Sequence, residues 1–389
     1  MEIIKQDQNT QFVRGDASMN TDYLNFIHLA FGVTEPKDSF AELLPKLYDG
    51  QFDAASLAYF VLKNGTIQAA TGTLDYQIRV CGQMLNCCAI GNVGVHPESR
   101  GQGYMTALMN IVTDRMLQNG TDIGVLAGKR HRYRYFGYEK SGTACHFRLI
   151  PDSINHSFGK ERVSRFTYRL IQESNTQDLN RINALLNQQN YIPIRSKNRL
   201  YQILRSWHNC ICCAYEGNRF VGFAVASQHT IAESHVCLTE DYTDFIVGLY
   251  DFLGRDSITV SLPLFEVAYT EAMYPICDTY ALETNASYLI LNYEKVISAL
   301  FKLKMRSCPL ADGKLVLLIH GARDERLNIE VVHGHSKVCA TAEKADLELD
   351  GISATNLLFS PYSPARMMLP SFAQAWFPLP LWMYHADLI

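Results

Sequence analysis

The 389-residue chain lacks several features that mark common classes of protein. No apolar run approaches the length of a membrane span, and the first seven residues show no signal-peptide pattern. A net charge of −4 gives none of the basic excess that attracts nucleic acid or anionic membranes. We therefore expect a cytoplasmic protein without nucleic-acid or membrane partners, long enough for two or three domains with sizeable cores.

The eleven cysteines include no paired Cys-x-x-Cys knuckles of the kind that bind zinc. One cluster, Cys87-Cys88, lies inside an apolar run, and a second comprises Cys210, Cys212 and Cys213. Small apolar cysteines are common in buried strands. We expect free thiols in a reducing compartment and no metal site.

Two glycine signatures for phosphate binding are also absent, because no Gly-Lys-Ser/Thr and no dinucleotide fingerprint occurs around the glycines at 101–103. The stretch 93–105 nevertheless joins an apolar run, 84–90, to an amphipathic helical pattern that stops at Asn119-Gly120. Free backbone N–H groups at such a junction can hold a phosphate, although an ordinary turn is the alternative. The expected binding residues are Val93, Gly94, Val95, Arg100, Gly101, Gln102, Gly103, Tyr104 and Met105.

The motif Val-x-Val-x-Pro-x-x-Arg-Gly-x-Gly resembles the pyrophosphate loop of the GCN5-related N-acetyltransferases (GNAT), Gln/Arg-x-x-Gly-x-Gly/Ala. Arg100 and Gly103 fill the first and fourth positions, whereas Met105 replaces the final small residue. The resemblance implies that the loop binds the pyrophosphate of acetyl-CoA. It also implies that Val93–Val95 lies beside the pantetheine.

The expected order of elements is similar to that fold. Helices over 21–31 and 39–47 precede a hairpin, 57–73, that turns at Asn64-Gly65, a dipeptide typical of tight hairpins. The meander, glycine loop, helix and short strand 123–126 follow, and a strand over 143–150 is expected to close a catalytic domain, 1–150. A second unit, 151–285, repeats this outline with a hairpin over 210–226 and a helix over 241–253, but lacks the arginine and glycines. We interpret it as a degenerate copy.

The remaining residues, 286–389, predict a helix and three strands before an Ala-Asp-Leu-x-Leu strand and a Ser-Ala-x-x-Leu-Leu helix, at 345–358. This pattern resembles the sterol-carrier-protein fold. The predicted fold class is therefore α+β: tandem GNAT folds with mixed, mostly antiparallel sheets and flanking helices, plus a sterol-carrier-like domain. That domain order is similar to the enhanced-intracellular-survival (Eis) branch.

A basic segment, 128–138, carries four cations in six residues and ends in Tyr-x-x-Phe-Gly-Tyr. The Eis resemblance assigns the general acid to Tyr133, and a phenol of pKa about 10 stays protonated at neutral pH to supply a thiolate leaving group. Tyr135 and Tyr138 are the alternatives, as is simple aromatic packing. Gly128 and Lys129 are expected beside the coenzyme phosphates.

The last twelve residues are aromatic and apolar, unlike the polar tail of most chains. In the Eis branch the chain ends inside the active site, and the terminal carboxylate is the general base. The resemblance assigns this role to Ile389, whose carboxylate would need a pKa raised by burial. Asp387 and His385 are alternative bases, and a tail that only fills a groove is the structural alternative.

Together these patterns predict an N-acetyltransferase that moves an acetyl group from acetyl-CoA to a primary amine by direct attack. Aminoglycosides, polyamines and lysine side chains stay equally open as acceptors. The resemblance also implies a homo-oligomer, with trimer-based hexamers among the relatives. The competing prediction is a non-catalytic protein that binds lipid or acyl-CoA through a vestigial transferase domain.

Overall fold

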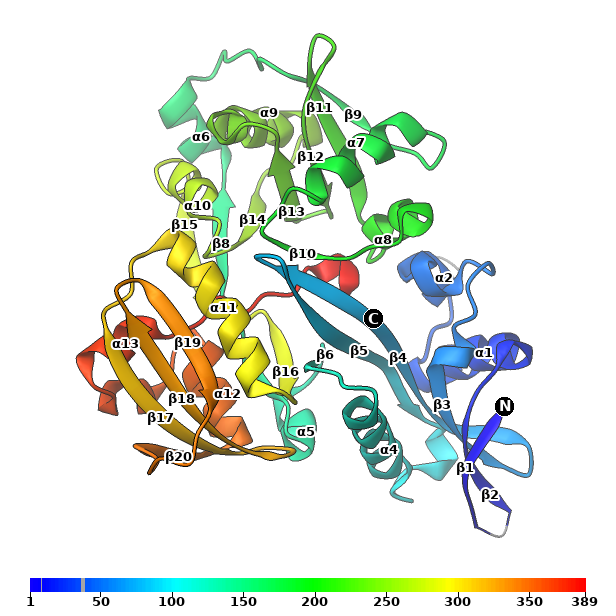
Figure 1. The fold of residues 1–389 in the computed structure, drawn as a ribbon. Coiled ribbons are helices and arrows are strands. Elements are labelled where there is room, and N and C mark those ends of the chain that lie inside the picture. The colour runs from blue at the N-terminus through cyan, green and yellow to red at the C-terminus, as the bar shows by residue number, and fades with distance from the viewer. Residues whose placement is uncertain (8, 36–38) are drawn as a thin grey trace.

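The computed structural model describes residues 1–7, 9–35 and 39–389, which build three β-sheets with helices around them (Figure 1). The first sheet has the order β1-β2-β3-β4-β5-β6-β16-β7, with β10 beside β4. Its strands are β1 (Glu2–Asp7), β2 (Thr10–Arg14), β3 (Ala58–Lys63), β4 (Thr66–Val80), β5 (Gln83–Val95), β6 (Ile123–Leu126), β7 (Glu139–Ser141), β10 (Tyr191–Pro193) and β16 (Ala286–Ile290).

Two helices lie on opposite faces of this sheet. The apolar side of α1 (Asn20–Phe31) joins the largest core cluster, together with the short helices α2 (Phe40–Leu43) and α3 (Pro45–Tyr48). The apolar side of α4 (Tyr104–Gln118) joins a separate cluster on the other face. The expected helix over the early residues, the glycine-loop helix and the short strand after it are all confirmed.

The turn between β3 and β4 forms as its sequence predicts. Asn64 and Gly65 have φ of 51° and 79°, the left-handed region in which Asn and Gly are the best tolerated residues. The two strands pair in antiparallel register from Ala58 opposite Gly72 to Lys63 opposite Thr66.

The second sheet has the order β15-β8-β14-β13-β12-β11-β9 and repeats part of the first. Antiparallel strands lead to β13, which pairs in parallel with β14 through the intervening helix α9, as β5 pairs with β6 through α4. The strands are β8 (Ala144–Leu149), β9 (Thr167–Leu170), β11 (Cys210–Glu216), β12 (Arg219–Ala226), β13 (Thr230–Val236), β14 (Ile258–Pro263) and β15 (Thr279–Glu283). The helices are α6 (Pro151–Phe158), α7 (Thr176–Leu186), α8 (Leu200–Arg205), α9 (Tyr242–Leu253) and α10 (Val267–Met273).

The first two sheets exchange strands, which corrects one sequence prediction. The strand expected over 143–150 forms, but β8 pairs with β14 and β15 of the second sheet instead of closing the first. In return β16, from beyond the predicted boundary at 285, fills the equivalent place between β6 and β7. Backbone hydrogen bonds are the same for any partner strand, so the local sequence of β8 does not reveal which sheet it joins.

The third sheet, β19-β18-β17-β20, is smaller. Its strands are β17 (Gly313–His320), β18 (Asp324–Val332), β19 (His335–Ala340) and β20 (Leu347–Asp350), and its helices are α11 (Tyr293–Ser307), α12 (Gly351–Phe359) and α13 (Ser371–Trp376). The strand and helix predicted between 345 and 358 are confirmed as β20 and α12.

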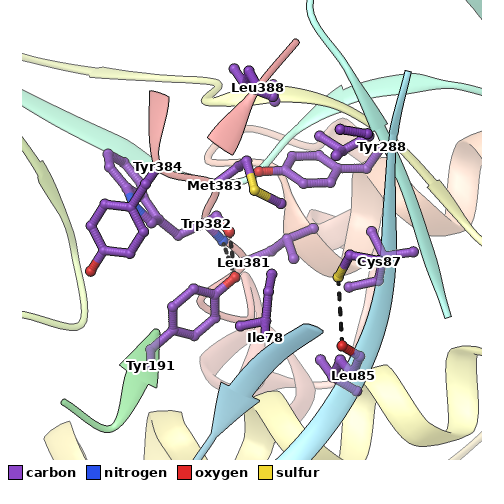
Figure 2. Packing of buried hydrophobic residues seen from close by; sticks show 14 of the residues in the cluster. Ile78, Leu85, Cys87, Tyr191, Tyr288, Leu381, Trp382, Met383, Tyr384 and Leu388 are labelled. Carbon is purple, nitrogen blue, oxygen red and sulfur yellow. Dashed lines mark hydrogen bonds between the residues drawn. The ribbon is translucent and has the colours of Figure 1, made fainter. Parts of the chain in front are cut away.

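The tail, residues 378–389, leaves this third unit and crosses back over the first sheet, where Figure 1 marks the C-terminus beside β4. Leu379 and the residues from Leu381 to Tyr384 are almost fully buried. Figure 2 shows Leu381, Trp382 and Met383 among Ile78, Cys87, Tyr191 and Tyr288, and Trp382 is hydrogen-bonded to the Tyr191 hydroxyl. Buried apolar side chains hold the tail, as the sequence predicts.

Within the described part of the chain, no helix is long and apolar enough to cross a membrane. The same residues contain no group of three or more His, Cys, Asp or Glu side chains arranged to hold a metal ion.

Candidate active site

The candidate site begins where β5 and β6 separate. The two strands pair in parallel from Cys87 opposite Ile123 to Ile90 opposite Leu126, and β6 ends there. On its other edge β5 carries a bulge, because Gly72 opposes Gly91 but the next pair is Ala70 with Gly94. Asn92 in this bulge has a φ of 51°. The extra residue bends the end of β5 and re-aims the side chains next to it.

A groove of about 850 Å³ opens beyond this point. All nine residues predicted from the glycine-loop motif, from Val93 to Met105, line it. Because β6 ends at Leu126, the edge of Val93–Val95 that faces away from β4 is turned toward the groove. The other lining residues are Ala30, Phe31, Ser99, Thr106 and Arg132.

The loop supplies the groove with free backbone donors. Gly101 and Gly103 have φ of 80° and 76°, and an added Cβ at either would meet no atom within 4 Å. Gly103 caps α4, and the first intrahelical hydrogen bond runs from the Ala107 N–H to the Gly103 carbonyl. The N–H groups of the first turn therefore have no acceptor within the helix and point at the groove with the positive end of its dipole. This arrangement suits a pyrophosphate.

The basic segment contributes one cation to the groove. Arg130 and Arg134 both form ion pairs with the carboxylate of the buried Glu139, at 2.5 and 3.2 Å. Arg132 lines the groove, but Gly128 and Lys129 do not. The expected contact of Lys129 with coenzyme phosphates thus has no support in the geometry. The segment folds as α5 (Arg130–Tyr133), with Lys129 at its N-cap, and a 3₁₀ turn.

Tyr133 is not among the residues that line the groove, and it lies beside the end of β6. Its ring packs so tightly on Gly128, two residues beyond β6, that a Cβ at Gly128 would lie 2.4 Å from the ring. Burial raises the pKa of Tyr133 above its ordinary value of 10, against a smaller opposing effect of Arg132. The phenol is therefore protonated at neutral pH. Of the two alternatives, Tyr135 is 77% exposed and Tyr138 is fully buried against Gly124.

The last residue approaches the same point from the other face of the sheet. An added Cβ at Gly91 would lie 2.2 Å from the Ile389 carbonyl oxygen, so the residue lies directly on β5 beside the bulge. Ile389 is 6% exposed and belongs to the α1-side core. Tyr133 and Ile389, 256 residues apart in the chain, therefore flank the point where β5 and β6 separate.

Three side chains hold the tail in this place. Lys46, buried on α3, donates to the carbonyl oxygens of Ala386 and Leu388 at 2.5 and 2.6 Å. The Trp207 indole N–H donates to the same Leu388 oxygen at 3.2 Å. Arg195 binds both carboxylate oxygens of Asp387, at 3.0 and 2.7 Å.

These contacts bear on the two alternative bases. Asp387 is committed to Arg195, which also forms a bidentate pair with Glu233 at 2.8 Å. His385 stacks on Trp207 with ring centroids 5.1 Å apart, and burial lowers its pKa, helped by Lys46. Both residues thus have structural contacts that account for them.

Sequence reasoning missed four residues of this site. Asn92 stands as a polar residue after Gly91 within an apolar strand, which is a signal for a bulge. Its side-chain amide donates to the Tyr48 hydroxyl at 2.6 Å. Lys46, Arg195 and Trp207 carry no local signal, because their partners lie more than 180 residues away.

Comparison with known proteins agrees with this geometry. The family model of the acetyltransferase (GNAT) domain matches residues 16–141. No curated protein matches the sequence of the chain.

Several solved structures share the fold of nearly the whole chain. A GCN5-related N-acetyltransferase from Kribbella flavida is 17% identical with a TM-score of 0.66, over 98% of both chains. A probable N-acyltransferase from Enterococcus faecalis V583 is 16% identical with a TM-score of 0.67, over 96% of this chain and 97% of that one. Eis1 from Mycobacterium abscessus is 13% identical with a TM-score of 0.64, again over 96% and 97%.

The domain match confirms the resemblance drawn from the glycine loop, and the three structures show that the mixed sheets and flanking helices form a GNAT-type fold. Residues 16–141, which contain the groove, the bulge and Tyr133, are an acetyltransferase domain of the GNAT family.

Proposed function

We propose that this protein transfers an acetyl group from acetyl-CoA to a primary amine by direct attack within a ternary complex. The observation that carries the proposal is the meeting of three features where β5 and β6 separate: the glycine-loop groove, the Tyr133 ring on Gly128 and the last residue on Gly91. Bringing both reactants together there supplies rate through orientation.

The groove residues fit the coenzyme. The N–H groups at the start of α4, with Arg100 and Arg132, suit its pyrophosphate, and the free edge of Val93–Val95 suits the amides of its pantetheine arm. When bound, acetyl-CoA supplies the activated thioester. The remaining chemistry is proton transfer by residues of this chain.

In the proposal Tyr133 is the general acid that protonates the departing sulfur. Its raised pKa supports this only in that the phenol is protonated at neutral pH, so that a proton is available when the thiolate leaves. Where the chain ends at Ile389, the terminal group is a carboxylate in apolar surroundings, which raise a carboxylate pKa. That carboxylate is the proposed general base for the acceptor amine.

The other units have supporting roles in the same proposal. Residues 151–285 are a second GNAT-like unit without the glycine loop, and the third unit is sterol-carrier-like, in the manner of the Eis branch. Both supply contacts to the tail. The contacts of the second unit come from Arg195, Trp207, Tyr191 and Asn285, and Lys304 of the third unit donates to the Pro378 carbonyl oxygen at 3.0 Å. The protein is proposed to act as a homo-oligomer.

The test combines calorimetry with acetyl-CoA and a thiol-release assay over a panel of amines. We expect micromolar binding and amine-dependent release. We expect Tyr133→Phe to lower kcat by roughly 10²–10⁴-fold, the range for one acid–base group. Tyr135→Phe, an exposed change two residues away, is the matched control and should be silent.

A variant extended by residues beyond Ile389 tests the base. It should bind acetyl-CoA normally and lose turnover, and full activity in this variant would exclude the terminal carboxylate. The competing function is a non-catalytic acyl-CoA or lipid carrier, which predicts coenzyme binding without thiol release for every amine. Absence of acetyl-CoA binding below the millimolar range would refute the enzyme.

A further inference from the structure

A second cavity of about 220 Å³ lies beside the tail, between β4 of the first sheet and the segment that follows β10. Half of its lining is apolar, and it is smaller than the roughly 300–1,000 Å³ of pockets for drug-sized ligands. The apolar side chains are Leu47, Phe52, Leu74, Tyr76, Ile194 and Ile203.

Strand register places this cavity relative to the groove. Gly72, Leu74 and Tyr76 oppose Gly91, Ala89 and Cys87, and alternate residues of a strand share a face. Leu74 and Tyr76 therefore share the sheet face on which Ile389 covers Gly91, about 7 and 14 Å away along the strand at the usual rise per residue. From the start of β5 toward its end, the strand therefore passes first the cavity, then Ile389 on Gly91, and then the groove, which begins at Val93.

Residues of the tail lie between the two spaces. Asp387 lines the cavity, and Ile389, two residues later, lies on Gly91 at the entrance to the groove. A transferase that holds both substrates in a ternary complex needs the acyl donor and the acceptor amine on opposite sides of the carbonyl group that reacts. The cavity occupies the side opposite the groove.

The charges of the cavity limit what it can hold. Asp387 is ion-paired with Arg195, which it shares with Glu233, and Arg199 pairs with Asp49 at 2.7 Å. Asp75 alternates with Leu74 and Tyr76 and opposes Cys88, a residue of the core on the α4 face, so its side chain points away.

Lys46 is the remaining charge. Among the residues that the structure describes it forms no ion pair with a carboxylate side chain, and its contacts are the two tail carbonyls. No unpaired carboxylate side chain of the described lining is therefore left to bind the additional ammonium groups of a polycation.

We propose that this cavity receives the acceptor, and that the acceptor is a small primary monoamine with an apolar body, not a polyamine or an aminoglycoside. The inference rests on the proposed function. The C–N bond forms as the acetyl C–S bond breaks, the C–S electron pair leaves on sulfur, Tyr133 protonates that sulfur, and the terminal carboxylate accepts the proton lost by the nitrogen.

The first test compares kcat/KM for 2-phenylethylamine and n-hexylamine with that for spermidine and kanamycin. We expect the two monoamines to be better by at least tenfold. The cavity is then filled by Ile194→Trp, a change at a side chain that is 42% exposed and therefore tolerant of added bulk. This variant should raise KM for the monoamines at least tenfold and leave the Kd of acetyl-CoA unchanged, with Ile194→Val as the conservative control.

Binding measured without turnover separates the two hypotheses. Ligand-observed NMR should detect 2-phenylethylamine on the wild type and lose it on Ile194→Trp. If this holds but no amine releases thiol, the proposed function fails while the cavity assignment stands. Preference for spermidine or kanamycin, or a monoamine KM and NMR signal unchanged in Ile194→Trp, would overturn the inference.

Discussion

Gly91 gives the sharpest prediction about the tail. An alanine there adds a Cβ at 2.2 Å from the carbonyl oxygen of Ile389 and 2.3 Å from its carbonyl carbon, whereas ordinary van der Waals contact begins at 3.4 Å. Both atoms are backbone, so no side-chain rotation relieves the overlap. The last residue has to move by about 1 Å or more.

The size of the effect follows from that displacement. A misplacement of about 1 Å in an active site costs on the order of 10²-fold in rate, or about 2.7 kcal/mol in activation free energy. Overpacking a core costs a further ~1–3 kcal/mol in the free energy of unfolding. We therefore expect Gly91→Ala to lower kcat about a hundredfold and to leave acetyl-CoA binding unchanged.

The assay is steady-state thiol release, with calorimetry for the coenzyme. Gly82→Ala, in the exposed turn before β5 with a φ of 83°, is a matched control that strains the backbone without touching the tail. This control should lower the free energy of unfolding and leave kcat unchanged. In a chain lacking Ile389, Gly91→Ala should have no further effect on kcat, because the group it displaces is gone. If the loss of Ile389 and Gly91→Ala instead lower kcat independently, so that their factors multiply in the double variant, the reasoning is refuted.

Three further predictions follow from charged groups. Burial lowers the pKa of Lys46 from 10.5 to about 7, so between pH 7 and 10.5 the folded protein binds fewer protons than the unfolded chain. The free energy of unfolding of the wild type, measured with urea, should then rise by roughly 3 kcal/mol relative to that of Lys46→Met from pH 7 to pH 9.5. If the free energy of unfolding depends on pH in the same way in both proteins, this prediction is wrong. Arg195→Met leaves two buried carboxylates, Glu233 and Asp387, unpaired and should cost about 3–5 kcal/mol in urea unfolding. Arg132→Ala should weaken acetyl-CoA binding up to about fivefold at low salt, whereas Lys129→Ala should leave it unchanged. If both variants weaken binding equally, Lys129 does lie beside the coenzyme phosphates, as the sequence predicts.

Local features of the site follow from the sequence because they depend on local sterics. The positive φ angles of Asn64-Gly65, Gly101 and Gly103 occur where the residue types predict them, and α4 begins directly after the loop. All nine motif residues line one groove, since a strand, a tight loop and a helix leave little freedom in how they connect. The sequence alone therefore predicted the groove in which we propose that the coenzyme binds.

The partners of each strand and each buried charge were decided only by the tertiary structure. The exchange of β8 and β16 between sheets leaves no local trace, because either sheet satisfies the same backbone groups. The sequence around Lys46 gives no sign of its role, because its two hydrogen-bond acceptors are carbonyl groups of the tail, about 340 residues later in the chain. Buried charges are stable only where packing brings partners to them, so the cavity that we propose for the acceptor forms only in the folded chain.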